Sequence, residues 1–314
     1  MKTFSIVIVN WNSGAQLKEC IDSINTSVQI NCILNKIIVV DNNSDDESLN
    51  LINNDLDNLT VLRNNKNFGF GKACNQGASN TQGDFILFLN PDTLIFKDTF
   101  LNLFNYIKIN ERADIGIYGV QLVDKDFDVQ RNCARFPSLS TFMIRSVGLN
   151  KLNPNLFKSY TMENWDHLST REVDQVMGAF FMIKRDLFIR LNGFDERFFI
   201  YYEELDLSKK IKDQGYKTLF VSEARAYHKG GGTSDQVKAK RLFYNTRSRI
   251  IYGLKHFGPL QGIFLLLFTF LIEPISRIFL LVMNGKYSDI IENLKGFWML
   301  YKDSYRIIKL GLKK

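Results

Sequence analysis

The stretch that most constrains the fold is a short apolar run that ends in an acidic turn. Residues 85–89 are all apolar (Phe-Ile-Leu-Phe-Leu), as in a central strand that is covered on both faces. Pro91 ends this strand, because proline donates no hydrogen bond to a sheet and disfavours helix in the residue before it. Asp92 should therefore lie at the carboxyl end of a strand, where open α/β sheets bind their ligands. Its carboxylate can hold a divalent metal that bridges a diphosphate, or it can cap a helix that begins at Thr93.

Strands and helices alternate before this run. Residues 4–9, 36–40 and 59–62 are predicted strands, with a helix from Ser13 or Gly14 to about residue 24 and a short helix after the polar turn at 42–47. This order predicts a parallel, doubly wound half-sheet. Beyond Asp92, the pattern predicts helices at 97–109, 185–190 and 203–214, and strands at 115–120, 173–183, 217–221 and 224–228.

Two regions lack clear periodicity. Residues 124–172 are rich in Asp, Asn, Pro and Ser, and we expect them to form loops that cover the site. A glycine-rich loop is predicted at 229–234. Gly69 and Gly71 precede a helical stretch and allow close backbone approach, which alone is weak evidence for a phosphate site.

Several motifs occur in an order that is known from one enzyme family. The chain resembles the inverting family 2 glycosyltransferases of the GT-A fold, and within them the rhamnosyltransferase-like branch that extends bacterial surface polysaccharides. The resemblance covers roughly residues 4–256 and implies an α/β, Rossmann-like, nucleotide-sugar-binding domain with a mixed central sheet over residues 1–256. The motifs are Val-Ile-Val-Asn-Trp-Asn (7–12), Val-Val-Asp-Asn-Asn-Ser (39–44), Asn-Phe-Gly-Phe-Gly (67–71), Asn-Pro-Asp (90–92), Gly-Ala (178–179), Gly-Phe-Asp-Glu (193–196), Glu-Glu-Leu-Asp-Leu (203–207) and His228 with Gly231.

The resemblance implies a donor site for a nucleoside-diphosphate sugar. Asp41 matches a residue that hydrogen-bonds the pyrimidine ring or ribose, although a strand-terminal Asp can equally cap its own turn through Ser44. Gly178 and Ala179 would leave room for the donor sugar. The implied donor-binding residues are Val9, Asn10, Asn12, Asp41, Asn67, Gly71, Asn90, Gly178 and Ala179.

Divalent metal is the implied cofactor, as Mg²⁺ or Mn²⁺. A diphosphate leaving group develops negative charge that a cation can neutralise, and a carboxylate is a suitable hard ligand. The resemblance implies that Asp92 contacts the metal and that His228 supplies an imidazole to the metal or the diphosphate. Asn90 stands where the wider family carries Asp, and one negative charge fewer predicts weaker metal binding.

Inversion at the anomeric carbon requires a base opposite the leaving group. The family usually carries Glu-Asp at this position, with the Asp as base, whereas this chain has Glu203-Glu204. Glu204 matches the base and Glu203 is the alternative. Glu is one methylene longer than Asp, so the assignment needs a shift of about an ångström in backbone or acceptor.

Charge is unevenly distributed along the 314 residues. Residues 1–228 carry a net charge of −3, whereas residues 229–314 carry +10, which indicates an anionic partner such as a membrane surface or phosphates. Residues 263–272 are apolar except for Thr269, and residues 278–283 are apolar. Glu273, Pro274 and Arg277 lie between these runs, which favours interfacial or re-entrant helices over a true span. We therefore predict a second region, residues 257–314, of membrane-associating helices; helices that pack on the first domain or on a second subunit are the alternative.

The remaining expectations concern setting and partners. Cys20, Cys32, Cys74 and Cys133 show no framework spacing, and the first apolar run is too short for a signal peptide, so we expect reduced thiols in a cytoplasmic protein at the inner membrane face. The expected activity moves a sugar from dTDP-rhamnose or a UDP-hexose to a lipid-linked or polymeric cell-surface glycan such as O-antigen. The alternative is a catalytically inactive glycan- or nucleotide-binding scaffold. We expect no nucleic-acid partner, and a homo-oligomer is compatible with the sequence.

Overall fold

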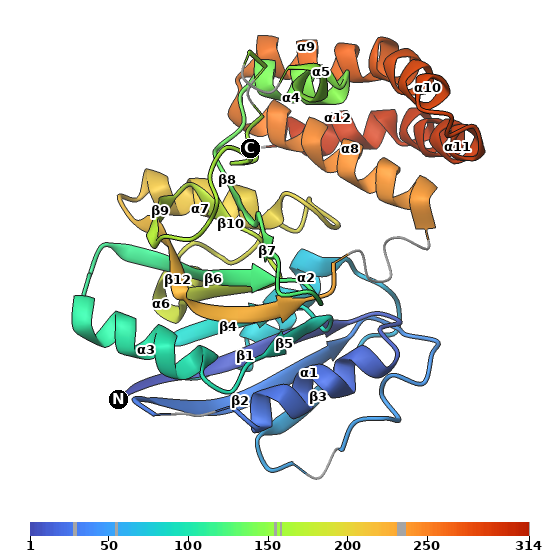
Figure 1. Ribbon diagram of the computed structural model, residues 1–314. Helices are drawn as coiled ribbons and strands as arrows, with labels where there is room; N and C mark the ends of the chain where they lie inside the picture. The colour runs from blue at the N-terminus through green and yellow to red at the C-terminus, as the bar shows by residue number, and fades with distance from the viewer. Residues whose placement is uncertain (28–29, 54–55, 154–155, 158, 231–236, 314) are drawn as a thin grey trace. The chain divides into compact units, whose positions relative to one another are not determined.

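The computed structural model describes residues 1–27, 30–53, 56–153, 156–157, 159–230 and 237–313 (Figure 1). They form two compact units, each built from several stretches of chain. The first comprises residues 1–135, 161–196 and 204–233, and the second comprises residues 136–160, 197–203 and 234–314. Helix α8 (Lys238–His256) precedes the predicted boundary after residue 256 but clusters with the second unit.

A mixed sheet of ten strands forms the centre of the first unit, as predicted. Strand β4 is parallel to β1, β1 to β2 and β2 to β3, which confirms the parallel half-sheet. Strand β11 runs antiparallel to both β4 and β6, while β12 is parallel to β6. The order is β3-β2-β1-β4-β11-β6-β12-β5, with β7 on β6 and β9 on β12. The bounds are β1 Lys2–Asn10, β2 Cys32–Asp41, β3 Leu59–Arg63, β4 Phe85–Leu89, β5 Thr93–Ile95, β6 Ile115–Val123, β7 Val129–Gln130, β9 Arg171–Val173, β11 Phe180–Lys184 and β12 Lys217–His228.

Helices cover both faces of this sheet (Figure 1). On one face α1 (Ala15–Asn25) and α3 (Thr99–Asn110) bury their apolar stripes; on the other α2 (Phe70–Ala78), α6 (Arg185–Arg190) and α7 (Glu203–Asp213) do so. Alternate residues of β4 enter the two cores, so its continuous apolar sequence matches a strand buried on both faces.

Several predicted elements were wrong. No helix follows the turn at 42–47 in the described residues, and Thr93 begins β5 rather than a helix. Residues 173–183 form parts of three strands rather than one, because the pairing partner changes along the run. Strand β9 pairs with β12, the next strand β10 pairs with β8, and β11 pairs with β4. Conversely, residues 217–228 are one strand whose register shifts between Val221 and Arg225. Residues 124–172 contain β7, β8 (Cys133–Ala134), α4 (Leu139–Ser146) and α5 (Leu149–Leu152), with β10 at Gln175–Val176; most of the predicted glycine-rich loop, residues 231–234, lies outside the described residues.

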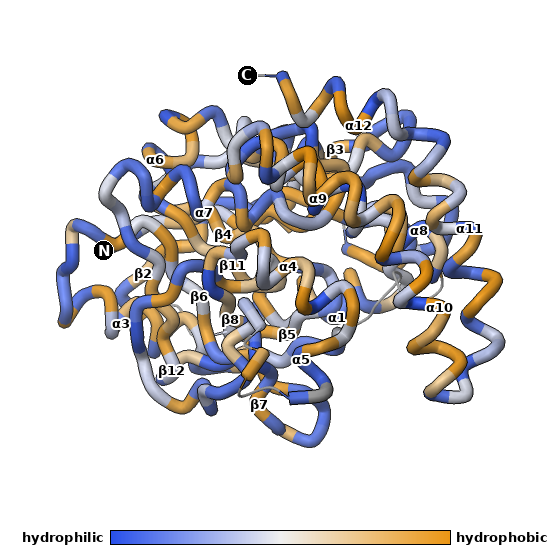
Figure 2. The backbone as a smooth tube through the Cα atoms, turned by 90° about the horizontal axis from the view of Figure 1, so that it is seen from above, coloured by the Kyte–Doolittle hydropathy of each residue, from blue (hydrophilic) through white to orange (hydrophobic). Residues whose placement is uncertain are grey.

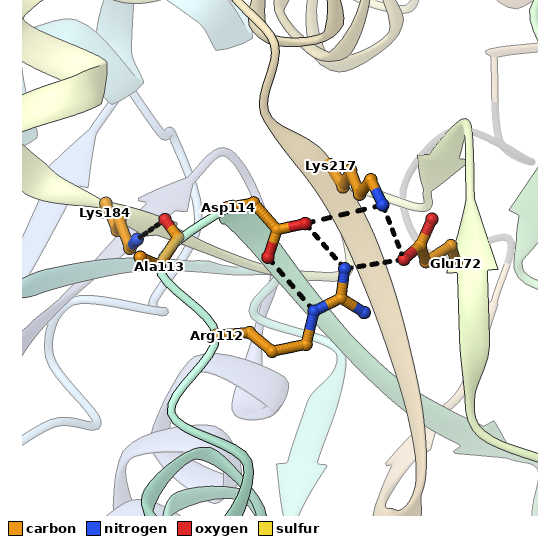
Figure 3. A network of polar contacts seen from close by, with 6 residues as sticks. All are labelled: Arg112, Ala113, Asp114, Glu172, Lys184 and Lys217. Atoms are coloured by element: carbon orange, nitrogen blue, oxygen red, sulfur yellow. Dashed lines mark hydrogen bonds and ion pairs between the residues drawn. The ribbon is translucent and has the colours of Figure 1, made fainter.

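Four charged side chains tie together the amino ends of neighbouring strands in the first unit (Figure 3). Arg112 forms ion pairs of 2.7 Å with both Asp114, before β6, and Glu172, in β9. Lys217, which begins β12, lies 3.4 Å from Asp114 and 3.1 Å from Glu172. The bonds to Arg112 lower the pKa of Asp114 to about 2. We call these four residues the amino-edge network.

The second unit is helical and is centred on α8. Helices α9 (Pro259–Leu271), α11 (Ser288–Lys302) and α12 (Ser304–Gly311) pack on α8, and α10 (Glu273–Met283) packs on α9 and α11. A Cβ atom on Gly262 would lie 2.8 Å from the Cα of Leu254, so glycine permits the close approach of α9 to α8.

The predicted interruption at Glu273 coincides with a bend between α9 and α10. Glu273 is fully buried and pairs with Arg249 and, at 2.8 Å, with Arg277. Burial would raise the pKa of Glu273, but the two guanidinium groups hold it below its ordinary value. Within the described residues, no single helix is long and apolar enough to span a membrane; α9 and α10 satisfy that test as a pair, bent by 44°.

Candidate active site

Strand order brings the predicted site residues of the first unit to one edge of its sheet. The parallel strands β1, β2 and β4 end at Asn10, Asp41 and Leu89. Because β11 is antiparallel to β4, its beginning lies at this same edge, with Phe180 opposite Leu89. We call this the carboxyl edge, where α/β sheets bind ligands.

Asp41 and Asn10 form a buried polar network at the ends of β2 and β1. One carboxylate oxygen of Asp41 accepts hydrogen bonds from Asn10 Nδ2 (2.8 Å) and Ser44 Oγ (2.6 Å), and the other accepts from the Ser44 backbone amide (3.2 Å). Asn10 Nδ2 also donates to Ser48 Oγ at 2.8 Å. Asp41 therefore does cap its turn through Ser44, and a role in donor binding would use its remaining acceptor capacity.

The other predicted donor-site residues shape the adjoining loops. Asn12 adopts a left-handed backbone (φ 52°), and its Oδ1 accepts from the Asp45 amide at 2.9 Å. Asn67 Oδ1 accepts from the Gly69 amide at 2.9 Å and so orders the turn that leads into α2, where Gly71 is buried. Val9 is buried in the core beneath them.

Backbone contacts fix the turn that carries Asn90 and Asp92. The Asn90 amide donates to the carbonyl oxygen of Ala179 at 3.1 Å, and Thr93 Oγ1 donates to that same oxygen at 3.3 Å. The Thr93 amide closes the turn by donating to the Asn90 carbonyl at 3.1 Å. Ala179 therefore joins the acidic turn to the strand that begins with Phe180.

Asp92 and His228 face one another, although 136 residues separate them in the sequence. Strand β12 pairs with β5 so that His228 lies opposite Thr93, and His228 Nε2 is 3.6 Å from Asp92 Oδ2, with both side chains largely buried (8% and 12% exposed). Burial lowers the pKa of His228 despite the opposing effect of Asp92, so the folded protein favours the neutral ring. A carboxylate oxygen and a ring nitrogen are thus held close together but beyond hydrogen-bonding distance.

Glu204 lies at the start of α7 and beside the Gly178–Ala179 segment. A Cβ atom added to Gly178 would lie 3.9 Å from the Glu204 carboxyl carbon. Glu204 Oε2 is buried and forms no hydrogen bond. Burial raises the pKa of Glu204, opposed by the backbone amides of Glu204 and Leu205. A carboxylate with a raised pKa suits a general base.

The backbone just before Glu204 is strained. Tyr201 and Tyr202 both adopt positive φ angles (67° and 71°), a conformation that is costly for bulky residues. The alternative base, Glu203, is only 3% exposed. Glu204 remains the predicted base, because its carboxyl group lies near Gly178.

Sequence reasoning missed one residue at this edge. Gln130 in β7 contacts both the ring and the backbone carbonyl of His228. It lies 98 residues from His228 and within the segment that was read as loops, so no local pattern pointed to it. The contact exists because β7 pairs with β6, the neighbour of β12.

A family model for "Glycosyl transferase family 2" matches residues 5–191, more than half of the chain. Three curated relatives are similar in sequence. Rhamnosyltransferase WbbL of Escherichia coli is 27% identical over 54% of this chain, and the aligned part spans 61% of that protein. N-acetylglucosaminyl-diphospho-decaprenol L-rhamnosyltransferase of Mycobacterium tuberculosis is 23% identical over 79% of this chain and 82% of its own length. The O-antigen chain rhamnosyltransferase RfbN of Salmonella typhimurium is 27% identical over 71% of this chain and 65% of its own.

Solved structures share the fold. GalNAc-T7, crystallised with UDP, GalNAc and Mn²⁺, matches with a TM-score of 0.53 and 18% identity over 83% of this chain and 53% of its own. The mannosyltransferase PcManGT of Pyrobaculum calidifontis, in complex with GDP-Man and Mn²⁺, matches with a TM-score of 0.50 and 14% identity over 96% of this chain and 86% of its own. At these identities the likeness concerns the fold, and it confirms the predicted GT-A architecture with its mixed sheet.

Proposed function

Because the chain belongs to glycosyl transferase family 2, we propose that it transfers a sugar from a nucleoside-diphosphate sugar to a hydroxyl group of a cell-surface glycan, with inversion at the anomeric carbon. The observation that carries this proposal is the Asp92–His228 pair at the carboxyl edge, with Glu204 beside Gly178 and the neighbouring Ala179 bonded to the turn that carries Asp92.

The Asp92–His228 pair fits a divalent cation. It offers a hard carboxylate oxygen and an imidazole nitrogen 3.6 Å apart, both shielded from water. No third Asp, Glu, His or Cys joins the pair among the described residues, so the diphosphate and water would complete the coordination. When bound, Mg²⁺ or Mn²⁺ stabilises the negative charge that develops on the departing diphosphate.

Glu204 is the proposed base. Its carboxylate takes the proton of the acceptor hydroxyl while the hydroxyl oxygen forms a bond to the anomeric carbon. The bond between that carbon and the diphosphate oxygen breaks in the same step, and its electron pair leaves with the diphosphate. Asn10, Asn12, Asp41 and Asn67 would hold the nucleoside part of the donor, because hydrogen bonds join their loops at the ends of β1 and β2.

The relatives support specific substrates. Three of them are named as rhamnosyltransferases, which makes dTDP-rhamnose the first donor to test and UDP-hexoses the second. The names of these relatives also refer to a diphospho-decaprenol and to an O-antigen chain, which supports a lipid-linked or polymeric glycan acceptor here.

The test is a panel of nucleotide sugars assayed with an N-acetylglucosaminyl-diphospho-lipid acceptor, with and without EDTA. We expect transfer from one donor, loss of transfer in EDTA, and recovery with Mg²⁺ or Mn²⁺. Nucleotide binding without turnover of any donor would instead favour the inactive scaffold. Full activity in EDTA would remove the metal from the mechanism and leave His228 without its proposed role.

We also propose that the second unit attaches the protein to the cytoplasmic face of an anionic membrane. Helix α9 contains only Gln261 and Thr269 as polar residues, and Thr269 is buried, so its exposed face is almost wholly apolar (Figure 2). Residues 229–314 carry a net charge of +10, which complements anionic lipids. The exposed apolar side chains of α9–α11 are Leu260, Ile263, Phe264, Leu267, Leu271, Ile275, Phe279, Val282, Met283, Ile291, Leu294 and Trp298.

This attachment is tested by co-sedimentation of the full chain with anionic and neutral vesicles. The double variant Phe264→Ser and Phe279→Ser should lose most binding, since apolar insertion contributes alongside charge. A control double variant in the first unit, Ile109→Ser and Ile189→Ser, removes two apolar residues of comparable or greater exposure and should bind normally. If the wild-type protein does not bind anionic vesicles but forms a dimer, and the Phe264→Ser and Phe279→Ser double variant is monomeric, this face is a subunit interface.

A further inference from the structure

Gln130 contacts His228 at two points. Its side-chain Nε2 donates a hydrogen bond of 2.6 Å to the backbone carbonyl of His228. Its side-chain Oε1 lies 3.0 Å from the ring Nδ1 of that same histidine. A single amide therefore holds both the backbone and the ring of His228.

The hydrogen bond to the backbone carbonyl determines which atom of the Gln130 amide faces the His228 ring. A backbone carbonyl only accepts hydrogen bonds, so the NH₂ group of Gln130 must face it. The amide oxygen of Gln130 consequently faces the ring, and an amide oxygen also only accepts. Nδ1 of His228 must therefore carry a hydrogen and donate it to Gln130 Oε1.

The opposite nitrogen is then the one that can bind a cation. A histidine ring that donates its Nδ1 hydrogen to Gln130 can ligate a cation only through Nε2. His228 Nε2 lies 3.6 Å from Asp92 Oδ2. The nitrogen that Gln130 leaves available for a cation is therefore the one next to the carboxylate.

We propose that Gln130 is a positioning residue that holds His228 in the Nδ1–H tautomer, so that Nε2, the ring nitrogen left to ligate a cation, lies next to the Asp92 carboxylate. Its consequence for cation binding rests on the proposed function. The assignment of the tautomer does not, because it follows from hydrogen bonds within the chain.

The topology explains why Gln130 can do this. Strand β7 is two residues long, and Gln130 pairs with Leu122 of β6, which itself pairs with Ala226 of β12. The ladder therefore fixes the backbone of Gln130 next to the end of β12. An orienting partner of this kind typically changes metal affinity by about 10–100-fold when it is removed.

The direct test is ¹⁵N NMR of the metal-free protein labelled at histidine. The chain has only three histidines, so His228 can be assigned by its loss in His228→Asn. A ring nitrogen that carries hydrogen resonates far from one that does not. We expect a hydrogen on Nδ1 and none on Nε2 at neutral pH. The reverse tautomer, or a doubly protonated ring, in the wild-type protein would overturn the proposal without any variant.

The variant Gln130→Met keeps the length of the side chain and removes both hydrogen bonds. We expect the His228 signals to move towards the Nε2–H form, while the His167 signals stay in place. Gln121→Met is the matched control, since Gln121 is a buried glutamine that donates to the backbone carbonyl of His167 at 2.7 Å. It should leave His228 unchanged. An unchanged His228 tautomer in folded Gln130→Met would contradict the proposal.

Metal affinity gives the second readout. Mn²⁺ binding in the presence of dTDP or UDP, followed by the EPR signal of free Mn²⁺, should weaken by about 10–100-fold in Gln130→Met and stay near normal in Gln121→Met. Wild-type protein that shows the expected tautomer but binds no Mn²⁺ would refute the metal part of the proposed function and leave the tautomer assignment standing. Normal Mn²⁺ affinity in Gln130→Met would overturn the link between the two.

Discussion

Both edges of the sheet in the first unit carry charged or ionisable side chains, but these side chains are bonded to one another only at the amino edge. At the amino edge, Arg112, Asp114, Glu172 and Lys217 are bonded to one another. At the carboxyl edge, His228 and Asp92 lie 3.6 Å apart without a hydrogen bond between them. Charges that satisfy one another hold strands together, whereas groups placed close without a mutual bond are candidates for binding something else.

The carboxylates at the two edges also differ in how their ionisation affects the stability of the fold. The amino-edge network lowers the pKa of Asp114 to about 2 and also lowers the pKa of Glu172, so the folded protein favours their ionised forms. Burial raises the pKa of Glu204, so folding disfavours its ionised form. Removing a carboxylate should therefore have opposite effects on stability at the two edges.

The largest expected effect is that of Asp92→Ala. If the cation supplies several kcal/mol of leaving-group stabilisation, transfer should slow by about 10³–10⁵-fold. Asp114→Ala, which removes a carboxylate from the amino edge, should leave the rate unchanged. Steady-state assays with saturating donor measure both. Equal rates in Asp92→Ala and the wild type would remove this residue from the mechanism.

Glu204→Gln should lower kcat by about 10²–10⁴-fold with donor affinity near normal, because the amide keeps the shape of the side chain but accepts no proton. Glu204→Asp, which restores the residue that the family usually carries, should retain part of the activity. Glu172→Gln is the control at the amino edge and should not change kcat. If Glu203→Gln is inactive while Glu204→Gln is active, the base is Glu203.

The pH dependence of the rate follows from the raised pKa of Glu204. The base must be ionised, so kcat/KM should fall as the pH drops through a value above the ordinary Glu pKa of about 4.3. A pH–rate profile of the wild type and of Glu204→Asp measures this limb. Activity that persists unchanged down to about pH 4 would show that Glu204 is not the base.

Substitutions at the two edges should shift the melting temperature in opposite directions. At pH 7, Glu204→Gln should melt higher than the wild type, because it removes an ionised group that burial disfavours; this gain should vanish below the pKa of an unfolded Glu. Arg112→Met should melt lower, by about 2 °C or less, since the network is exposed. Calorimetry at neutral pH measures both shifts. A lower melting temperature for folded Glu204→Gln would refute the contrast.

The smallest effect is the acid dependence of the amino-edge network. Because the folded pKa of Asp114 is depressed to about 2, its stabilising contribution is complete above the unfolded pKa of about 4 and is lost as the pH falls through about 2. The difference in melting temperature between the wild type and Arg112→Met should therefore be constant above about pH 5 and shrink below about pH 4. A difference that is the same at pH 3 and pH 7 would show that the carboxylates do not contribute.

Local pattern was sufficient to predict much of the first unit. The all-apolar residues of β4 indicated a doubly covered strand, and the spacing of apolar residues in α1 indicated its buried face. Residues 173–183 were misread because their composition is strand-like throughout, whereas their pairing partners change twice. Composition reports the tendency to form a strand but not the neighbour with which it pairs.

The sequence was sufficient to predict which residues form the site, but not which of them contact one another. Asp92 and His228 came from motifs, and their distance came only from the pairing of β5 with β12. Gln130 carries no motif, and its contact with His228 depends on two successive ladders. Nonlocal hydrogen bonds of this kind leave no periodic pattern in the sequence.

The measurement that tests the central claim most directly is the configuration of the product made from dTDP-rhamnose or a UDP-hexose. The wild-type enzyme should transfer the sugar to the lipid-linked acceptor with its anomeric configuration inverted, as read by NMR of the purified product. Glu204→Gln should bind the nucleotide and yield almost no product, while Glu172→Gln should match the wild type. Retention of configuration, or normal transfer by Glu204→Gln, would contradict the account of the carboxyl edge.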